Sequence, residues 1–270
     1  MLRHPCAFIS IHVDELRQYH EARLAALQQD RVCADNDGRS ARAAASPFPF
    51  TPGPYRFMND RVVAAFDFDG TITTSDSFRA FMLDAAGPAR FAAAALRCLP
   101  SLIGVPLGWS PRGPTKARFL YAAMGGVRRE VLEAAAQRFV ERRLPALLRA
   151  EMLSRVAEHQ ALGHEIVLVS ASPSIYLRMW AKTVGIGTVL SSELEWRDGV
   201  YTGHLAGNNC WGPEKVARLR AWWGANAPAT LYAYGDSRGD KEMAELAQYA
   251  WIRGKSALPP LAAAGGFGAA

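Results

Sequence analysis

Val62-Val-Ala-Ala-Phe-Asp-Phe-Asp-Gly-Thr71 is an apolar run that ends in two carboxylates and a glycine-threonine turn. The run predicts a strand buried on both faces, where charges are normally excluded, yet Asp67 and Asp69 stand where this strand meets its loop. Open α/β sheets bind their ligands at this end of a parallel strand. Because side chains alternate along an extended chain, both carboxylates face the same side and can share one small site.

The paired carboxylates need a partner, because two close carboxylates repel unless a cation or a shared proton holds them. Gly70 lets a backbone N–H come close to an anion, and the Thr71 hydroxyl can donate a hydrogen bond to it. These residues suggest a magnesium-assisted attack of an aspartate on a phosphate. An isolated Asp-x-Asp-Gly is also a common polar turn, so the segment alone leaves both interpretations open.

The composition is that of a folded globular protein with a basic character. The chain has 270 residues, 50% of them hydrophobic, and a net charge of +6 with a pI near 9.3. A basic protein suits an anionic partner such as a phosphate ester, a lipid surface or nucleic acid. Nucleic acid is the least favoured partner, because no recognised binding motif accompanies the scattered arginines.

The cysteines and the first residues favour a cytoplasmic protein. Cys6, Cys33, Cys98 and Cys210 lack C-x-x-C spacing, which argues against a zinc site and against a disulfide framework. The start lacks the apolar core and the small-residue cleavage site of a secretory signal. We expect a cytoplasmic location, with peripheral contact at the inner membrane surface as an option.

Residues 1–57 differ in composition from the remainder. The proline-rich stretch Ser46-Pro-Phe-Pro-Phe-Thr-Pro-Gly-Pro54 predicts a linker or a disordered arm. An alternative is a gene-model extension, with the native chain starting at Met58 directly before the first strand. Mass spectrometry of the native N-terminus separates these two hypotheses. At the other end, residues 257–270 are predicted to form a flexible tail.

From residue 62 onward, apolar strands alternate with helical patterns, which predicts an α/β fold with a Rossmann-like parallel sheet flanked by helices. The segment between the first two strands is too long for one crossover, so residues 76–160 are predicted to form an inserted helical cap. The catalytic core then comprises 58–75 and 161–256. Trp196-Arg-Asp-Gly-Val-Tyr201 predicts a β-hairpin. Strands are predicted at 62–67, 165–170, 188–194, 230–234 and 249–252.

Three further motifs fall at strand ends or helix starts. Ser170 ends the second apolar strand, and Ser172-Pro173 predicts the N-cap and first position of the next helix, a ready anion site. Gly212-Pro-Glu-Lys215 opens a later helix, and Gly235-Asp-Ser-Arg-Gly-Asp240 follows another strand. Each has an ordinary interpretation as a helix cap, a solvated lysine or a turn. Their joint occurrence at strand ends favours one common site.

Together these motifs resemble the four motifs of the haloacid dehalogenase superfamily of phosphohydrolases. The resemblance covers roughly 62–254 and rests on Asp67-Phe-Asp-Gly-Thr71, Val167-Leu-Val-Ser170, Lys215 and Gly235-Asp-Ser-x-x-Asp240. The helical insert resembles the phosphoserine-phosphatase-like branch, subfamily IB. The resemblance implies a Rossmann-like core, magnesium dependence and an aspartyl-phosphate intermediate.

The catalytic roles that the resemblance implies are chemically sensible. Asp67 would attack phosphorus and become the phosphoaspartate. Asp69 would protonate the leaving alcohol and then activate water. Ser170 and Lys215 would hold the phosphoryl oxygens and offset the charge that develops during transfer.

The resemblance also implies a Mg²⁺ site. Asp67, Asp236 and the backbone carbonyl of Asp69 would supply oxygen ligands to this hard ion. Asp240 would lie behind these ligands and orient Lys215 or a metal-bound water. Gly70 would belong with Thr71 to the substrate-binding loop.

The substrate is less well indicated than the chemistry. Phosphoserine phosphatases carry a glutamate nine residues after the nucleophile, which binds the substrate amine, and this chain has Asp76 there. The carboxylate is one methylene shorter, so phosphoserine stays an option. Asp76 also suits the N-cap of the helix that enters the cap.

A lipid phosphate is the competing substrate. Phe91–Trp109 is an apolar stretch, but Arg97, Pro100 and Pro106 argue against a transmembrane helix. An apolar cap surface on the membrane is an alternative, and residues 75–160 contain thirteen Lys and Arg against seven Asp and Glu. The same branch includes bacterial phosphatidylglycerophosphate phosphatases with apolar caps. A buried cap helix beside a solvated basic face is the ordinary interpretation.

A relative that binds phosphorylated ligands without turning them over is the non-enzymatic alternative. It is disfavoured because no motif position is substituted.

Overall fold

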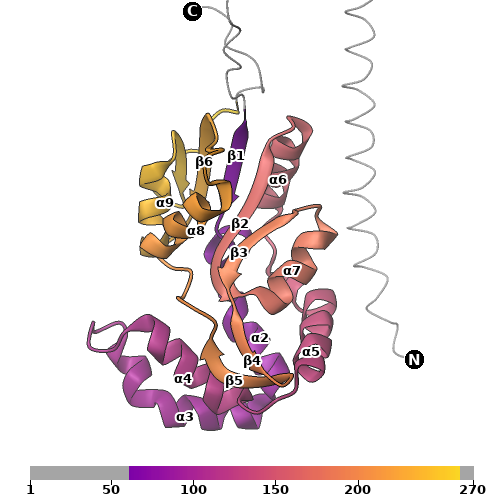
Figure 1. The fold of residues 1–270 in the computed structure, drawn as a ribbon, viewed down its shortest axis with the longest axis vertical. Coiled ribbons are helices and arrows are strands. Elements are labelled where there is room, and N and C mark those ends of the chain that lie inside the picture. The colour runs from indigo at the N-terminus through magenta and orange to yellow at the C-terminus, as the bar shows by residue number, and fades with distance from the viewer. Residues whose placement is uncertain (1–60, 262–270) are drawn as a thin grey trace, which may run out of the picture. The chain divides into compact units, whose positions relative to one another are not determined.

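The computed structural model describes residues 61–261 (Figure 1). The predictions for residues 1–57 therefore lie outside the described residues, as does the 262–270 part of the predicted tail. Residues 257–261 lie against the core, where Leu258 and Leu261 pack on apolar side chains and the carbonyl of Pro259 accepts a hydrogen bond from Arg155.

The core contains a five-stranded parallel sheet in the order β3-β2-β1-β6-β7. Phe66, at the end of the central strand, pairs with Leu168 on one side and with Tyr234 on the other, so three strands deliver their carboxyl ends to one edge. The predicted α/β architecture is confirmed. The strands are β1 (Val62–Phe66), β2 (Glu165–Pro173), β3 (Thr188–Ser192), β6 (Thr230–Gly235) and β7 (Tyr249–Ile252).

Helices cover both faces of this sheet. Side chains alternate along each buried strand, so every strand presents apolar residues to both faces, and each face needs a cover. Ala64 and Phe66 face a large apolar cluster with α6 (Ala150–Ala161) and α7 (Ser174–Thr183). Val63 and Ala65 face a smaller cluster with α8 (Pro213–Trp223) and α9 (Lys241–Leu246). In Figure 1, α6 and α7 lie on one side of the sheet and α8 and α9 on the other.

A helical cap is inserted after β1. Its helices are α2 (Ser77–Ala86), α3 (Pro88–Gly104), α4 (Arg112–Met124) and α5 (Arg129–Arg142). The short helix η2 (Leu144–Leu147) follows, and α6 then packs on β2. Thus α6, which falls almost entirely within the predicted 76–160 cap, lies against the core sheet. No helix within residues 61–261 is long and apolar enough to cross a membrane.

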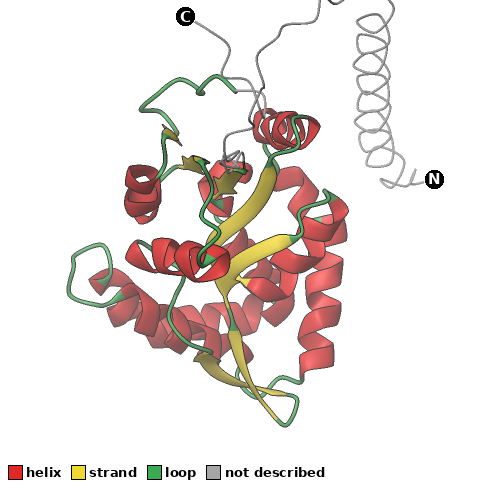
Figure 2. Cartoon of the chain, turned by 45° about the horizontal axis from the view of Figure 1, so that its top comes forward, coloured by secondary structure: helices red, strands yellow, loops and turns green. Residues whose placement is uncertain are grey.

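The predicted hairpin forms from β4 (Leu194–Arg197) and β5 (Val200–Leu205), and it packs with the cap helices (Figure 2). Its turn residues, Asp198 and Gly199, both have positive φ angles, as a tight hairpin requires. Tyr201 binds the strand to the segment between α4 and α5, because its N–H donates to Val127 at 2.9 Å. The predicted strand at 188–194 is shorter in the structure, because β3 ends at Ser192. Leu194, the last residue of the predicted strand, starts the hairpin instead.

The predicted N-cap at Ser172 is wrong. β2 continues through Pro173, which itself occupies the N-cap position of α7 without a side-chain capping bond. The Ser172 hydroxyl instead donates to Asp69, as described below. A serine followed by proline satisfies the local rule for a helix start, but a long-range acceptor takes its hydroxyl.

Candidate active site

The loop after β1 turns sharply and presents Asp67 at the sheet edge. The N–H of Asp67 donates to the carbonyl of Tyr234 at 2.9 Å, so the loop starts from a fixed point on β6. Gly70 has a φ of 76°, and a Cβ atom there would lie 2.0 Å from Oδ2 of Asp236. Only glycine therefore allows this backbone to approach the second acidic loop so closely.

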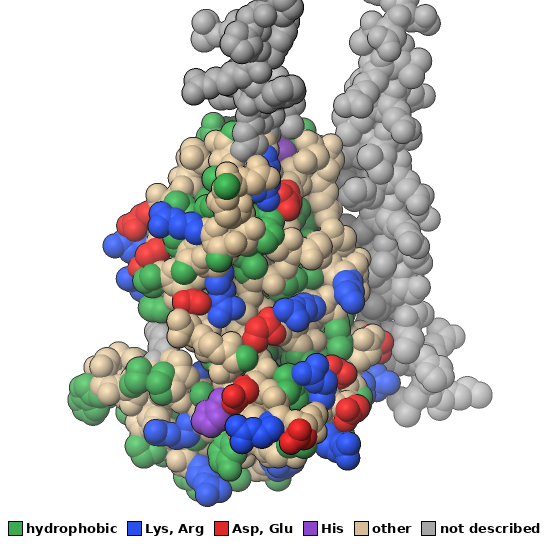
Figure 3. Space-filling view, in the orientation of Figure 1, with side chains coloured by type: hydrophobic (Ala, Val, Ile, Leu, Met, Phe, Trp, Pro, Cys, Tyr) green, Lys and Arg blue, Asp and Glu red, His purple; other side chains and the backbone are tan. Residues whose placement is uncertain are grey.

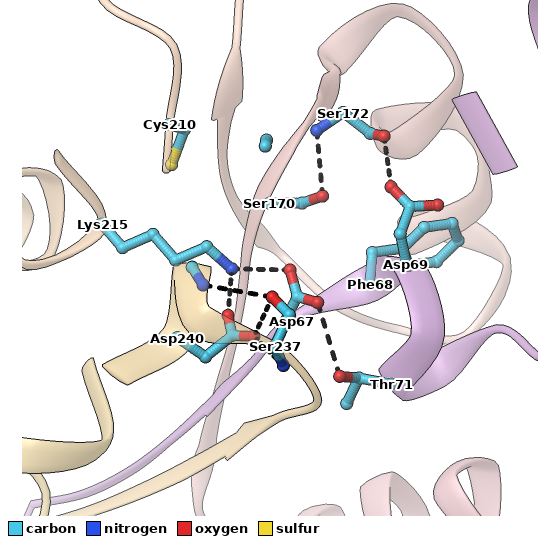
Figure 4. Close-up of polar contacts among 12 residues, drawn as sticks. Asp67, Phe68, Asp69, Thr71, Ser170, Ser172, Cys210, Lys215, Ser237 and Asp240 are labelled. Carbon is cyan, nitrogen blue, oxygen red and sulfur yellow. Dashed lines mark hydrogen bonds and ion pairs between the residues drawn. The ribbon is translucent and has the colours of Figure 1, made fainter. Parts of the chain in front are cut away.

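Lys215 is the centre of a buried ion-pair network (Figure 4). Its Nζ lies 2.6 Å from Oδ1 of Asp67 and 2.6 Å from Oδ1 of Asp240. Burial alone would lower the pKa of Lys215, but the two carboxylates raise it above its ordinary value, so the amine stays charged. The first turn of α8, opened by Pro213, holds this cation against Asp67.

Asp240 is held from several directions. Its Oδ2 accepts hydrogen bonds from the N–H of Asp236 at 3.2 Å and from the N–H and hydroxyl of Ser237 at 3.0 and 3.1 Å. Ser237 and Asp240 form a capping box at the short helix Arg238–Asp240. Its Oδ1 accepts from the amine of Lys215 at 2.6 Å, so this carboxylate links the Asp236 loop to Lys215.

Asp69 points toward the cap rather than toward Lys215. Its Oδ1 accepts from the N–H of Ser77 at 2.6 Å, and its Oδ2 accepts from the hydroxyl of Ser172. Burial raises the pKa of Asp69, with a smaller contribution from the charge of Asp76, while these hydrogen bonds lower it. A carboxyl group with a raised pKa holds its proton at a higher pH, which suits a general acid.

The acidic residues carry more negative charge than Lys215 neutralises. Burial raises the pKa of Asp67, and Asp240 adds to this while Lys215 opposes it. The pKa of Asp236 is also raised, mainly by burial and then by Asp240. Arg253 reaches only to 3.9 Å from Asp236. The cluster is therefore an environment that a further cation would stabilise.

The donors in this cluster fit a hard divalent cation. Carboxylate oxygens of Asp67, Asp236 and Asp240 lie within 4.8 Å of one another. Asp240 is the most fully engaged of the three, since its Oδ1 accepts from Lys215 and its Oδ2 accepts from three donors of Asp236 and Ser237, whereas Oδ2 of Asp67 has only the long 3.4 Å contact with Thr71. Asp67 and Asp236 are therefore the carboxylates best placed to hold Mg²⁺. An all-oxygen set with two carboxylates and room for water is typical of Mg²⁺ sites. These two residues are among the predicted metal ligands.

The two hydroxyl residues of the motifs are placed differently. Ser170 is buried in β2, three residues before the strand ends at Pro173, and lines the cavity; its Oγ accepts from the N–H of Ser172 at 3.1 Å, which leaves its proton for a substrate oxygen. Thr71 is fully buried, and its hydroxyl contacts Oδ2 of Asp67 at 3.4 Å. The N–H of Gly70 donates to the hydroxyl of Thr73 at 3.2 Å. Of the predicted phosphate contacts in this loop, Thr71 thus lies outside the cavity lining.

A cavity of about 590 Å³ joins the sheet edge to the cap. Core residues line its floor, and cap residues line its opposite wall. Asp76 belongs to this wall and is also the N-cap of α2, since its Oδ1 accepts from the N–H of Arg79 at 3.0 Å. The lining includes Asp67, Asp69, Ser170, Lys215 and Asp236 from the core, and Phe78, Leu102, Val105, Lys116 and Phe119 from the cap.

Lys116 of α4 is a site residue that sequence reasoning missed. Its Nζ donates to the carbonyl of Ala171 on β2 and lies 4.5 Å from the centroid of the Phe78 ring. Burial lowers the pKa of Lys116 to about 8, although Asp69 and Asp76 raise it. No local signal marks this residue, because only the packing of the cap brings it over the sheet edge.

This combination of sheet, cap and acidic loops defines a class of enzyme. A family model described as haloacid dehalogenase-like hydrolase matches residues 64–245. The chain belongs to the haloacid dehalogenase-like hydrolases, which confirms the predicted family and that the protein is an enzyme of this hydrolase class.

Particular relatives fit this assignment. The chain is 37% identical to Protein CicA of Caulobacter vibrioides over 203 residues, which covers 74% of this chain and 90% of that protein. A Bordetella pertussis protein of unknown function has a similar structure, with a TM-score of 0.63, 25% identity, and coverage of 70% of this chain and 88% of that one. The fold is also shared with a probable phosphoserine phosphatase from Vibrio cholerae, at a TM-score of 0.54, 15% identity, and coverage of 70% and 55%.

Proposed function

We propose that this chain is a magnesium-dependent phosphomonoester hydrolase that works through an aspartyl-phosphate on Asp67. The observation that carries the proposal is the buried Asp67–Lys215–Asp240 network at the floor of a cavity. A nucleophilic carboxylate held beside a permanent cation, at the end of a parallel strand, suits attack on an anionic phosphoryl group.

In the first step, an oxygen of Asp67 forms a bond to phosphorus while the bond from phosphorus to the alcohol oxygen breaks. Asp69 gives its proton to the departing alcohol. In the second step, Asp69 takes a proton from water, whose oxygen attacks phosphorus and releases inorganic phosphate and free Asp67. Covalent catalysis of this kind divides one difficult displacement into two easier ones.

Ser170 and Lys215 would hold the phosphoryl oxygens during both steps. Lys215 supplies a fixed positive charge, and Ser170 supplies a hydrogen-bond donor near the carboxyl end of β2. Asp67 and Asp236 would bind Mg²⁺, which neutralises phosphate charge and positions the phosphate when bound. Asp240 keeps Lys215 and the Asp236 loop in place.

The wall of the cavity favours a leaving group with both polar and apolar parts. Asp76 and Lys116 bring opposite charges to this wall. Phosphoserine carries an amine and a carboxylate that could pair with them, so it is our first candidate substrate. A lipid phosphate is the second candidate, because the apolar Leu102 and Val105 line the same cavity.

The proposal is tested by a substrate screen on the purified full chain. Phosphoserine, sugar phosphates, nucleotides and phosphatidylglycerophosphate are offered with Mg²⁺ and with a chelator. We expect release of phosphate that requires Mg²⁺ and falls at least about 10³-fold in Asp67→Asn, because that variant lacks the nucleophile. Asp84→Asn, an exposed change on α2, is the matched control and should keep full activity. Substantial turnover by Asp67→Asn would overturn the proposal.

A further inference from the structure

The outer side of helix α3 is apolar where a cap helix should be polar. Ala94 and Cys98 face inward and are buried, while Leu96, Leu99 and Ile103 lie on the opposite side. Their spacing of three and four residues places these three side chains in one stripe along the helix. Leu96 is 73% exposed and Ile103 is 51% exposed. A helix that packs on a core by one face normally shows charged or polar residues on the other.

The loop after α3 extends this apolar surface. Leu107 and Trp109 are both exposed, Trp109 by 79%. Figure 3 shows hydrophobic side chains gathered at the corner of the cap where α3 is followed by the loop to α4. We call the stripe of α3 together with Leu107 and Trp109 the α3 face. Tryptophan is enriched where proteins meet the boundary between lipid and water.

The stretch of sequence that contains the α3 face carries charges of one sign. Residues 85–129 contain no Asp or Glu. They contain seven basic residues, namely Arg90, Arg97, Arg112, Lys116, Arg118, Arg128 and Arg129. Arg90 and Arg97 are exposed on α3 itself, and Arg118 is exposed on α4. Helix α5 is different, because Glu130, Glu133 and Glu141 accompany its arginines.

We propose that the α3 face docks on the surface of an anionic phospholipid bilayer. Its apolar side chains would enter the boundary between head groups and acyl chains, and its flanking arginines would pair with lipid phosphates. A second copy of this chain fits less well, because a two-fold interface would place the same basic patch against itself. The stripe lies parallel to the helix axis, as for a helix that rests on a membrane rather than spanning it.

Docking would bring the cavity close to the bilayer. Leu102 and Val105 line the cavity, and both belong to the segment that carries the α3 face. A substrate or product at the membrane surface would then have a short path to the site. The docking itself does not rest on the proposed phosphatase activity, because it depends only on the exposed side chains and charges of the cap.

Vesicle co-sedimentation of the full chain tests the proposal. The vesicles are phosphatidylcholine alone, and phosphatidylcholine with phosphatidylglycerol at roughly three to one. We expect binding to the mixed vesicles only, and weaker binding at high salt, because salt screens the arginines. Leu96→Gln with Ile103→Gln should weaken binding by about tenfold or more. Arg97→Gln should weaken it by about fivefold.

A matched control separates docking through the α3 face from non-specific hydrophobic adsorption to vesicles. Val131, on α5, is 56% exposed and outside the α3 face, so Val131→Gln should bind like the unchanged chain. Circular dichroism melting checks that all variants fold. Asp67→Asn should bind vesicles normally, so failure of the membrane proposal and failure of the phosphatase proposal are distinguishable.

Three results would overturn the proposal. They are equal binding to both kinds of vesicle, binding to neither kind, and a dimer in light scattering that is lost in Leu96→Gln with Ile103→Gln. The last result would assign the α3 face to a second copy of the chain.

Discussion

Two lysines reach the same cavity from the two parts of this molecule, and they are held in different ways. Lys215 of the core is fully buried between Asp67 and Asp240, each 2.6 Å away. Lys116 of the cap donates to one backbone carbonyl and lies over a phenylalanine ring. The carboxylates raise the pKa of Lys215, whereas burial lowers the pKa of Lys116 to about 8. The core therefore holds a permanent positive charge beside Asp67, whereas the positive charge of Lys116 in the cap is lost as the pH rises past about 8.

Removal of the core lysine should have the largest effect. Lys215→Met leaves Asp67 and Asp240 buried without their cation, so we expect loss of stability of about 3 kcal/mol and a fall in kcat of about 10³-fold or more. Urea unfolding and steady-state kinetics measure the two effects. Lys116→Met is the matched comparison and should unfold close to the unchanged chain. Equal stability losses in the two variants would contradict the distinction between the lysines.

The metal site should give the next largest effect. Asp236→Asn removes one of the two carboxylates that would hold Mg²⁺, so we expect the Mg²⁺ concentration for half-maximal activity to rise by about tenfold or more. Addition of Mg²⁺ should also raise the melting temperature of the unchanged chain, because a ligand that binds only the folded state stabilises it. Asp84→Asn is the control. A melting temperature that responds to Mg²⁺ equally in Asp236→Asn would place the ion elsewhere.

The cap lysine should affect substrate affinity more than turnover. Lys116→Met should raise KM for an anionic substrate by about tenfold and leave kcat within a few-fold, because a lost charge-assisted contact outside the reacting atoms weakens binding. The charge is present below pH 8 and lost above it, so KM of the unchanged chain should rise as the pH passes about 8. Lys116→Arg keeps its charge and should remove this rise. A pH profile identical in Lys116→Met and the unchanged chain would exclude the role.

Much of the core site is predictable from sequence because a parallel sheet delivers the carboxyl ends of its strands to one edge. Asp67 and Asp236 each follow an apolar strand and Ser170 lies near the carboxyl end of another, so locating the strands brings them together. Lys215 is predicted by its motif, but its two buried carboxylate partners are set by tertiary packing.

The cap is less predictable because its contacts with the core are long-range. Nothing near Lys116 in sequence marks it as facing Ala171, and the bond from Ser172 to Asp69 competes with the local capping signal. The sequence predicts the hairpin turn through its Asp198-Gly199 pair. The position of the hairpin beside the cap depends instead on two backbone hydrogen bonds, from the N–H of Tyr201 to the carbonyl of Val127 and from the N–H of Gly126 to the carbonyl of Tyr201.

The smallest expected effect separates the two roles of Asp76. Asp76→Ala removes the N-cap of α2 and should lower stability by about 1 kcal/mol, whereas Asp76→Asn keeps a capping side chain and should cost less. If Asp76 also binds a substrate amine, both variants should raise KM for phosphoserine by a similar factor. Urea unfolding and KM measurements give the two readouts. An unchanged KM in both variants would leave Asp76 with the capping role alone.

The central claim is that Asp67 carries the phosphoryl group during turnover. Its most direct test is to quench the unchanged chain during turnover, reduce the protein with borohydride and locate the modified residue by mass spectrometry. Borohydride reduces an acyl phosphate to the alcohol, so the account predicts homoserine at position 67, dependent on substrate and absent from Asp67→Asn. Reduction at Asp69 or Asp236 instead, or turnover by Asp67→Asn at the rate of the unchanged chain, would contradict the account.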